Sequence, residues 1–341
     1  MFNTLKAILT LVAIFLLAVK PSSAQNGEGF YSFLNIPSST KIYGLGGINI
    51  STVDGGIESV EQNPALLGPE YKKNLGIGYM RYFGNSNFGS IAFGNAIREH
   101  NAWSVGIRYL GYGEIQQTDP DGSVTGSYSP IDFIASFSYS MDINDRLRGG
   151  VALKSVYSAY DRFTSFALAV DLGINYYDPE RDLSLSATVV NLGGQLKRFD
   201  QAYERLPIDV RLGWTQSFPG LPIRFSITAW NLTKWNIPYV IVNGTQSEEF
   251  KLKHTFASNL FRHLVFAADI IPSEHFYFCL GYNYKVRTDM SSAYRNLLSG
   301  LYLGCGLNVG QWGIGIAYAQ PHSGANTFMV NISTTLNQFL K

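Results

Sequence analysis

From Leu75 to the C-terminus, apolar side chains alternate with small or polar ones in segments of about ten residues. In residues 164–177, every second residue from Phe166 to Tyr176 is apolar, whereas the residues between them are Ala, Asp, Gly or Asn. Alternation with a period of two indicates a β-strand with two different faces. Segments of this length and pattern are typical of strands that cross a bacterial outer membrane.

About fourteen such segments follow one another, and single-chain bacterial barrels have an even number of strands. We therefore predict an all-β fold, a transmembrane antiparallel up-and-down β-barrel of about 14 strands with an N-terminal plug. The expected strands are residues 75–83, 87–98, 101–112, 130–142, 146–158, 163–177, 183–193, 206–218, 222–232, 260–271, 275–286, 298–309, 312–320 and 325–336.

The connections between these segments form two sets that alternate along the chain. Every second connection is a short turn, whereas the long ones are residues 113–129, 194–205, 233–259 and 287–297. Outer-membrane barrels have short periplasmic turns and longer outer loops. The sorting by length predicts a membrane barrel with both of its ends on the periplasmic side, and it would be an accident in a soluble sandwich.

The N-terminus has the features of an export signal. An apolar run from Ala7 to Val19 is followed by Ser22-Ser23-Ala24, which suits cleavage after Ala24. A retained anchor helix is the alternative, but the apolar run is too short to span a bilayer. We predict a signal peptide at 1–24, a hatch or plug at 25–74, where Gly, Ser, Asn and Pro break any long periodicity, and a barrel at 75–341. The mature protein is expected in the outer membrane, in contact with its lipid.

Composition and chemistry exclude several other classes. Aromatic residues reach 14% and charged residues only 15%, below the roughly 25% of an average domain. A net charge of +1 argues against a nucleic-acid partner. The five histidines lack metal-ligand spacing, and no catalytic Ser/His/Asp arrangement stands out. We predict no enzyme activity, cofactor or metal site. Cys279 and Cys305 fall on opposite strand faces, so we expect no disulfide between them.

Charged residues within the predicted strands mostly share the face opposite the apolar one. A cation facing lipid would cost about 2–4 kcal/mol near the bilayer midplane, so these side chains should point into the lumen. Both signs are present, which favours paired struts that hold a plug, with a transport pathway as the alternative. The predicted lumen network comprises Arg108, Asp132, Arg148, Lys154, Asp171, Asp209, Arg211, Arg224 and Asp269.

The long loop 233–259 is a candidate surface for a partner. It carries Trp235 and Tyr239 among other apolar groups, and Trp and Tyr are favoured anchors of protein interfaces. The alternative, equally open from the sequence, is that this loop folds over the mouth of the barrel.

The N-terminal segment carries a family resemblance. Phe33-Leu34-Asn35-Ile36-Pro37-Ser38-Ser39, then Gly46-Gly47, then Asn63-Pro64-Ala65 resemble the entry signature of the FadL-like barrels of Bacteroidetes. In FadL-type proteins an Asn-Pro-Ala motif lies in a hatch within a fourteen-stranded barrel, a fold shared with PorV-like proteins. Within the group, the first two motifs and the plug-then-barrel order over nearly the whole mature chain most resemble the PorQ-type barrels of the type IX secretion system.

The resemblance implies a non-enzymatic role at the cell surface. PorQ-type barrels hold a PorZ-like surface protein near a PorU-like sortase and a PorV-like barrel, in a complex that attaches secreted cargo to lipopolysaccharide. The alternative is a FadL-like channel for hydrophobic solutes, gated by the hatch. An outer-membrane lipase or protease is a third and weaker alternative.

Overall fold

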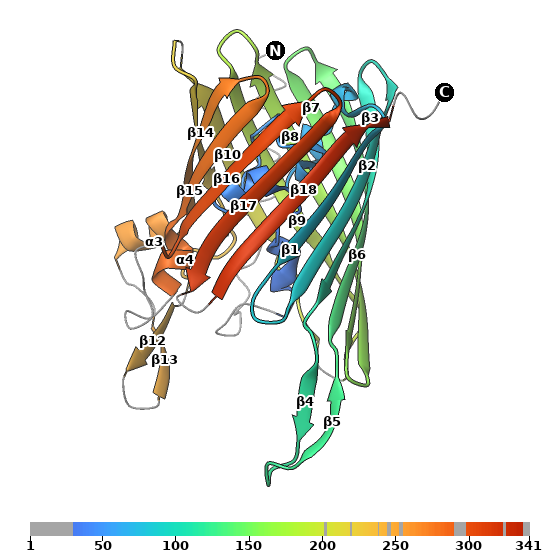
Figure 1. The fold of residues 1–341 in the computed structure, drawn as a ribbon, viewed down its shortest axis with the longest axis vertical. Coiled ribbons are helices and arrows are strands. Elements are labelled where there is room, and N and C mark those ends of the chain that lie inside the picture. Colours follow the sequence, from blue (N-terminus) through green and yellow to red (C-terminus); the bar gives the residue numbers. More distant parts are fainter. Residues whose placement is uncertain are drawn as a thin grey trace.

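The structure is a computed structural model that describes residues 30–200, 203–218, 220–237, 239–243, 247–251, 255–289, 298–322 and 325–336. Fourteen antiparallel strands form a closed barrel, which confirms the predicted fold class (Figure 1). The first strand, β1, pairs with the last, β18, from Asn74 opposite Thr335 to Arg81 opposite Phe328. Closure leaves no sheet edge for lipid to meet, as a membrane-spanning sheet requires.

The barrel strands agree with the predicted segments to within a few residues. They are β1 (Asn74–Arg81), β2 (Asn87–Arg98), β3 (Asn101–Gly111), β6 (Ile131–Asn144), β7 (Leu147–Tyr160), β8 (Phe163–Asp178), β9 (Leu183–Lys197), β10 (Asp209–Ser217), β11 (Ile223–Ala229), β14 (Leu264–Ser273), β15 (Phe276–Asn283), β16 (Leu301–Val309), β17 (Trp312–His322) and β18 (Ala325–Thr335).

The long connections gather at one end of the barrel, which we call the outer end, and they hold structure that the sequence analysis did not predict (Figure 1). A hairpin of β4 (Ile115–Thr118) and β5 (Val124–Tyr128) and a second of β12 (Tyr239–Asn243) and β13 (Ser247–Lys251) project beyond the wall. Two short helices, α3 (Phe256–Arg262) and α4 (Tyr284–Asp289), lie beside the outer ends of β14 and β15.

The two faces of the wall differ as the alternation predicts. Outward side chains such as Ile77, Leu153 and Ile314 are 51%, 51% and 48% exposed, although all three are aliphatic. Such a belt suits lipid, whereas inward neighbours such as Asp171 are buried. No helix in the described ranges is long and apolar enough to cross a bilayer.

Strand β9 departs from regular pairing at Asn191. This residue adopts φ 59°, and its N–H donates to the Asp171 carboxylate at 2.7 Å where the β8–β9 register shifts. Val190 is the last β9 residue opposite β10, so among the described residues 192–197 pair with β8 alone. Residues 203–208 run beside this part of the wall, and Leu206 is buried in the lumen core.

Residues 30–73, which we call the plug, lie inside the barrel (Figure 1). Their helices have three to five residues: η1 (Ser32–Asn35), α2 (Thr40–Gly44), η2 (Ile57–Glu61), η3 (Pro64–Leu66) and η4 (Pro69–Tyr71). Helices this short are unstable alone, so the plug depends on the wall for its conformation. The predicted signal peptide and residues 25–29 lie outside the described residues.

The plug runs the length of the lumen. Phe30 packs on Tyr160 and Phe199 at the outer end, with ring centroids 4.9 and 4.5 Å away, and the plug ends at Lys73, next to the start of β1. The described part of the plug therefore starts at the outer end and finishes at the periplasmic end, where β1 begins.

The outer half of the lumen is apolar, contrary to the expectation of small and polar lumen faces. Tyr31, Phe33, Leu34 and Ile36 of the plug join one buried cluster with wall residues. The wall side chains in this cluster include Met80, Phe88, Leu110, Ile134, Val156 and Met329. This part of the barrel therefore has the close-packed core of a soluble domain, and the plug supplies five of its 17 buried residues.

Candidate functional site

The candidate site is the contact between plug and wall, because the motif residues and most of the predicted lumen charges meet there. Phe33, Leu34 and Ile36 are at most 6% exposed in the outer apolar cluster, and Pro37 is buried beside them. The next residue, Ser38, donates its hydroxyl to Glu61 Oε2 at 2.8 Å, which ties the start of the plug to η2.

The Gly-Gly motif follows α2 and requires glycine. Gly46 and Gly47 have φ values of +97° and +86°, which only glycine adopts readily. A Cβ on the facing wall residue Gly281 would lie 2.1 Å from Gly46 N, so the plug backbone here lies directly against the wall. Asn283 on the same strand donates to Gly46 O at 3.3 Å.

The Asn-Pro-Ala motif forms a second close approach. Asn63 caps η3 by accepting from Ala65 N at 2.9 Å, and its amide donates to Ile50 O at 2.9 Å. On the wall, a Cβ at Gly150 would lie 2.3 Å from the Pro64 carbonyl carbon, and one at Gly173 would lie 2.1 Å from Asn63 Oδ1. The motif therefore fits a surface made flat by two wall glycines.

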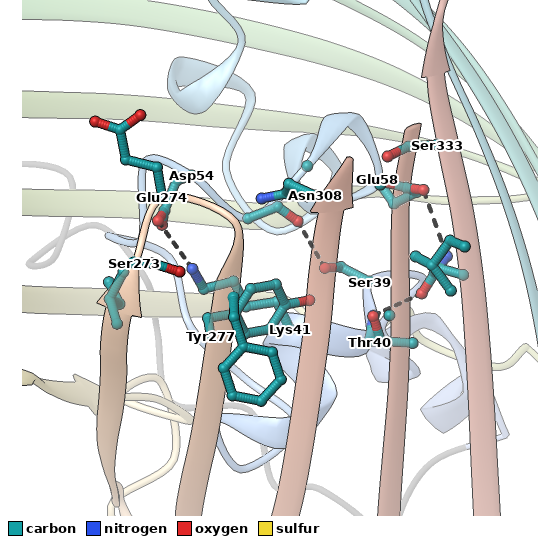
Figure 2. A pocket seen from close by; sticks show the side chains of 18 residues that line it. Ser39, Thr40, Lys41, Asp54, Glu58, Ser273, Glu274, Tyr277, Asn308 and Ser333 are labelled. Carbon is teal, nitrogen blue, oxygen red and sulfur yellow. Dashed lines mark hydrogen bonds and ion pairs between the residues drawn. The ribbon is translucent and has the colours of Figure 1, made fainter. Parts of the chain in front are cut away.

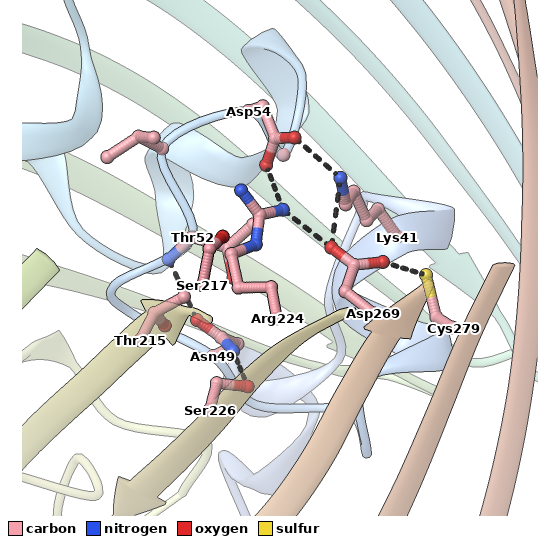
Figure 3. A network of polar contacts seen from close by, with 12 residues as sticks. Lys41, Asn49, Thr52, Asp54, Thr215, Ser217, Arg224, Ser226, Asp269 and Cys279 are labelled. Carbon is pink, nitrogen blue, oxygen red and sulfur yellow. Dashed lines mark hydrogen bonds and ion pairs between the residues drawn. The ribbon is translucent and has the colours of Figure 1, made fainter. Parts of the chain in front are cut away.

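Four charges join the plug to β11 and β14 (Figure 3). Lys41 Nζ lies 2.9 Å from Asp54 and 3.2 Å from Asp269, and Arg224 Nη2 lies 2.7 Å from Asp54 and 2.6 Å from Asp269. Burial acts to lower the pKa of Lys41, but the carboxylates of Asp54 and Asp269 outweigh it, so the pKa is raised and Lys41 stays charged. Cys279 donates its thiol to Asp269 at 3.3 Å.

Three more predicted lumen cations contact the plug at separate places. Arg108 Nη1 lies 3.1 Å from Glu61, and Arg148 Nη1 lies 3.1 Å from Glu70. Arg211 donates to Gln62 at 3.3 Å and to Asn35 at 2.7 Å. The plug is thus fastened around its circumference.

The remaining predicted charges connect wall residues only, as far as the described residues show. Asp132 accepts from Tyr112, Tyr160 and Ser158 near the outer end. Lys154 forms an ion pair with Asp171, and Asp209 with Arg211 at 2.9 Å. The predicted network is therefore several separate groups. The sequence analysis missed the plug partners, Lys41, Asp54, Glu61 and Glu70, although charges in a segment rich in Gly and Ser are a signal that could have indicated them.

A polar cavity of about 120 Å³ lies at the periplasmic end, between the plug and β14–β18 (Figure 2). Its lining includes Lys41, Glu58, Tyr277, Asn308 and Ser333. Pockets for small molecules usually have about 300 Å³ or more and are mostly apolar, so this cavity suits water better than a hydrophobic solute. Burial, with help from nearby Glu61, raises the pKa of Glu58 to about 7.

The two candidate docking residues lie in the outer loop between β11 and α3. The Trp235 ring stacks on His263 at 5.1 Å and contacts Phe256 at 5.2 Å, yet Trp235 remains 41% exposed. Its carbonyl lies 3.0 Å from His263 Nε2, which fixes the base of the loop. Tyr239 is the first residue of β12, in the hairpin that projects beyond the wall. Cys279 and Cys305 are both free, as predicted.

The fold and the filled lumen define a plugged outer-membrane barrel. No family model and no curated protein matches this chain. Its structure is similar to that of the Pseudomonas putida toluene transporter TodX, with a TM-score of 0.57 and 10% identity over 87% of this chain and 97% of that chain.

Two further solved structures are similar. The monoaromatic hydrocarbon channel CymD has a TM-score of 0.53 and 12% identity over 88% of this chain and 97% of that one. A Pseudomonas aeruginosa FadL homologue has a TM-score of 0.50 and 12% identity over 91% of this chain and 100% of that one. At these identities the likeness shows the fold: this chain has the FadL-like barrel fold of outer-membrane proteins.

Proposed function

We propose that this chain is a non-enzymatic outer-membrane barrel that holds a surface protein by its outer loops while its lumen stays closed. The observation that carries the proposal is the fastening of the plug, by an apolar core at the outer end and by ion pairs at several points around the wall. Each large apolar side chain of the plug would cost about 1.5–3 kcal/mol to expose, so ejecting the plug as a unit is expensive.

The resemblance of the N-terminal motifs to those of PorQ-type barrels indicates which partner to expect. It favours the attachment complex of the type IX secretion system, in which this barrel would hold a PorZ-like surface protein close to a PorU-like sortase and a PorV-like barrel. The β4–β5 and β12–β13 hairpins project where such a partner would bind, and Trp235 at the base of the second hairpin offers a partly exposed aromatic side chain.

The test is recovery of partners in mild detergent from cells that express the tagged, full-length protein. We expect a surface protein and a sortase-like protein to co-purify, and replacement of residues 239–251 by a Gly/Ser linker of equal length to reduce their recovery. The matched control replaces the short turn 145–146, at the periplasmic end, in the same way. Absence of both partners from the intact protein's eluate would refute the anchoring role.

The second candidate is a channel for hydrophobic solutes, and two observations favour it. Two of the three similar solved structures are by name a toluene transporter and a monoaromatic hydrocarbon channel, and the outer lumen is lined by apolar side chains. In this chain the plug fills that lining. Uptake of fatty acids or toluene that is lost in a deletion strain and restored by the intact gene would support the channel, whereas unchanged uptake with loss of surface proteins would support the anchor.

A further inference from the structure

Helix α3 buries its polar side chains and exposes its apolar ones, which is the reverse of a helix that faces water. Arg262 is fully buried and Asn259 is 5% exposed, whereas Phe256, Phe261 and Leu260 are 68%, 46% and 37% exposed. A surface helix normally points its apolar stripe at the protein and its charges at solvent. The reverse order indicates that the exposed side of α3 meets an apolar medium.

The polar side of α3 is fixed by the protein itself. Arg262 donates to Thr288 Oγ1 at 2.7 Å and to Asp289 Oδ1 at 2.5 Å, both on α4. Asn259 donates to Asn236 Oδ1 at 3.3 Å. These contacts hold the helix in one rotation about its axis, so the direction of its aromatic side chains is set by specific bonds.

The apolar side continues the lipid-facing belt of the wall. The Phe261 ring lies 6.3 Å from that of Phe266 and 5.9 Å from that of Tyr284. Phe266 faces outward on β14, opposite Ile227 on β11 and on the same strand face as exposed Ile270. Figure 1 shows α3 and α4 on the flank of the barrel at its outer end. The exposed side chains of α3 therefore extend the lipid-facing surface of the barrel.

We propose that α3 lies in the outer leaflet of the membrane, with Leu260 and Phe261 among the lipid acyl chains and Phe256 at the headgroup level. Aromatic and aliphatic side chains on a helix parallel to the membrane surface bind at this boundary. Because α3 directly follows the loop that carries the β12–β13 hairpin, its insertion fixes the height of that hairpin above the membrane.

The test places a nitroxide spin label at residue 261, through Phe261→Cys in a Cys305→Ala background, and reconstitutes the full-length protein in lipid vesicles. Cys279 is fully buried and does not take the label. Two control sites bracket the result: Ile316→Cys, 41% exposed on the lipid-facing side of β17, and Val124→Cys, 59% exposed on the projecting β5. Collision with oxygen, which enters lipid, is compared with collision with a water-soluble nickel chelate.

We expect the label at 261 to favour oxygen over the nickel chelate, as at 316. A preference for the nickel chelate, as at 124, would overturn the proposal. Shielding from both reagents would overturn it too, because a protein surface, from a partner or a second copy, would then cover α3. Heat-dependent gel mobility checks that each variant forms a barrel, and Leu260→Cys serves as a second reporter if the first fails to fold.

Discussion

Substitution of Lys41 by Met removes the plug's only cation from the four-charge cluster and leaves the carboxylates of Asp54 and Asp269 with Arg224 alone. Removal of one partner from a buried ion pair costs about 3–5 kcal/mol, since the remaining charge is buried without compensation. Two features of this site reduce the cost. Arg224 still contacts both carboxylates, and the Asp54 side chain is 46% exposed and can regain water.

We therefore expect the low end of that range, about 3 kcal/mol, or about a 100-fold rise in the population in which α2 has left the wall. Hydrogen exchange of backbone amides measures this population directly. The reporter is the Leu45 amide, which donates to Lys41 O at 3.0 Å and exchanges only when α2 opens. The matched control is Lys72→Met, the same change at an exposed position of the plug.

The reasoning would be refuted if Lys41→Met left the exchange of Leu45 within about threefold of the unaltered protein, a difference below 1 kcal/mol. An equal acceleration in Lys72→Met would refute it as well, because the effect would then come from the loss of any plug cation. Heat-dependent gel mobility confirms in both variants that the barrel itself remains folded.

Two further predictions concern the plug. The folded-state pKa of Glu58, about 7, lies above its usual 4.5, so its stabilising effect is complete below pH 4.5 and is lost as the pH rises through 7. Hydrogen exchange of the amides in residues 57–67, corrected for intrinsic rates, should therefore become faster between pH 5 and pH 8. The free energy of opening this part of the plug should fall by up to about 3 kcal/mol over that range, and Glu58→Gln should abolish the trend. Gly150→Ala places a methyl group 2.3 Å from the Pro64 carbonyl carbon, so it should lower the free energy of opening residues 63–67 by about 1–3 kcal/mol. The control is Gly89→Ala, which has open space around its Cβ and should leave this free energy unchanged. Equal hydrogen exchange in the two variants would contradict the proposed fit.

The wall of the barrel could be predicted from the sequence because its physics is local. In β8, each residue meets either lipid or lumen, so the alternation from Phe166 to Tyr176 alone specifies a strand and its two faces. The turn at 179–182 is short because adjacent antiparallel strands need only a tight connection on the periplasmic side. The same rules hold at each strand, and they therefore gave the strand count.

The interior could not be predicted in the same way, because its contacts join residues far apart in the chain. On β2, Phe88 faces the lumen, whereas Ile91 faces outward. An apolar group on the lumen face is explained only by the plug, which packs beside Phe88. Arg224 could be assigned to the lumen from the alternation, but its bond to Asp54 spans 170 positions. Helix α3 was assigned in part to a strand, since apolar residues at 260 and 261 are ambiguous between strand and helix.

The contacts of the last strand with the plug have a consequence for the stability of the closed barrel. Asn331 on β18 donates to Ser38 O at 2.9 Å and accepts from Thr40 N at 2.6 Å, and Thr327 on the same strand bonds the Tyr43 hydroxyl. The strand that closes the barrel against β1 therefore also bonds the plug. Closure of the seam and docking of the plug stabilise each other, so deletion of residues 30–73 should weaken the closed barrel as well as empty it.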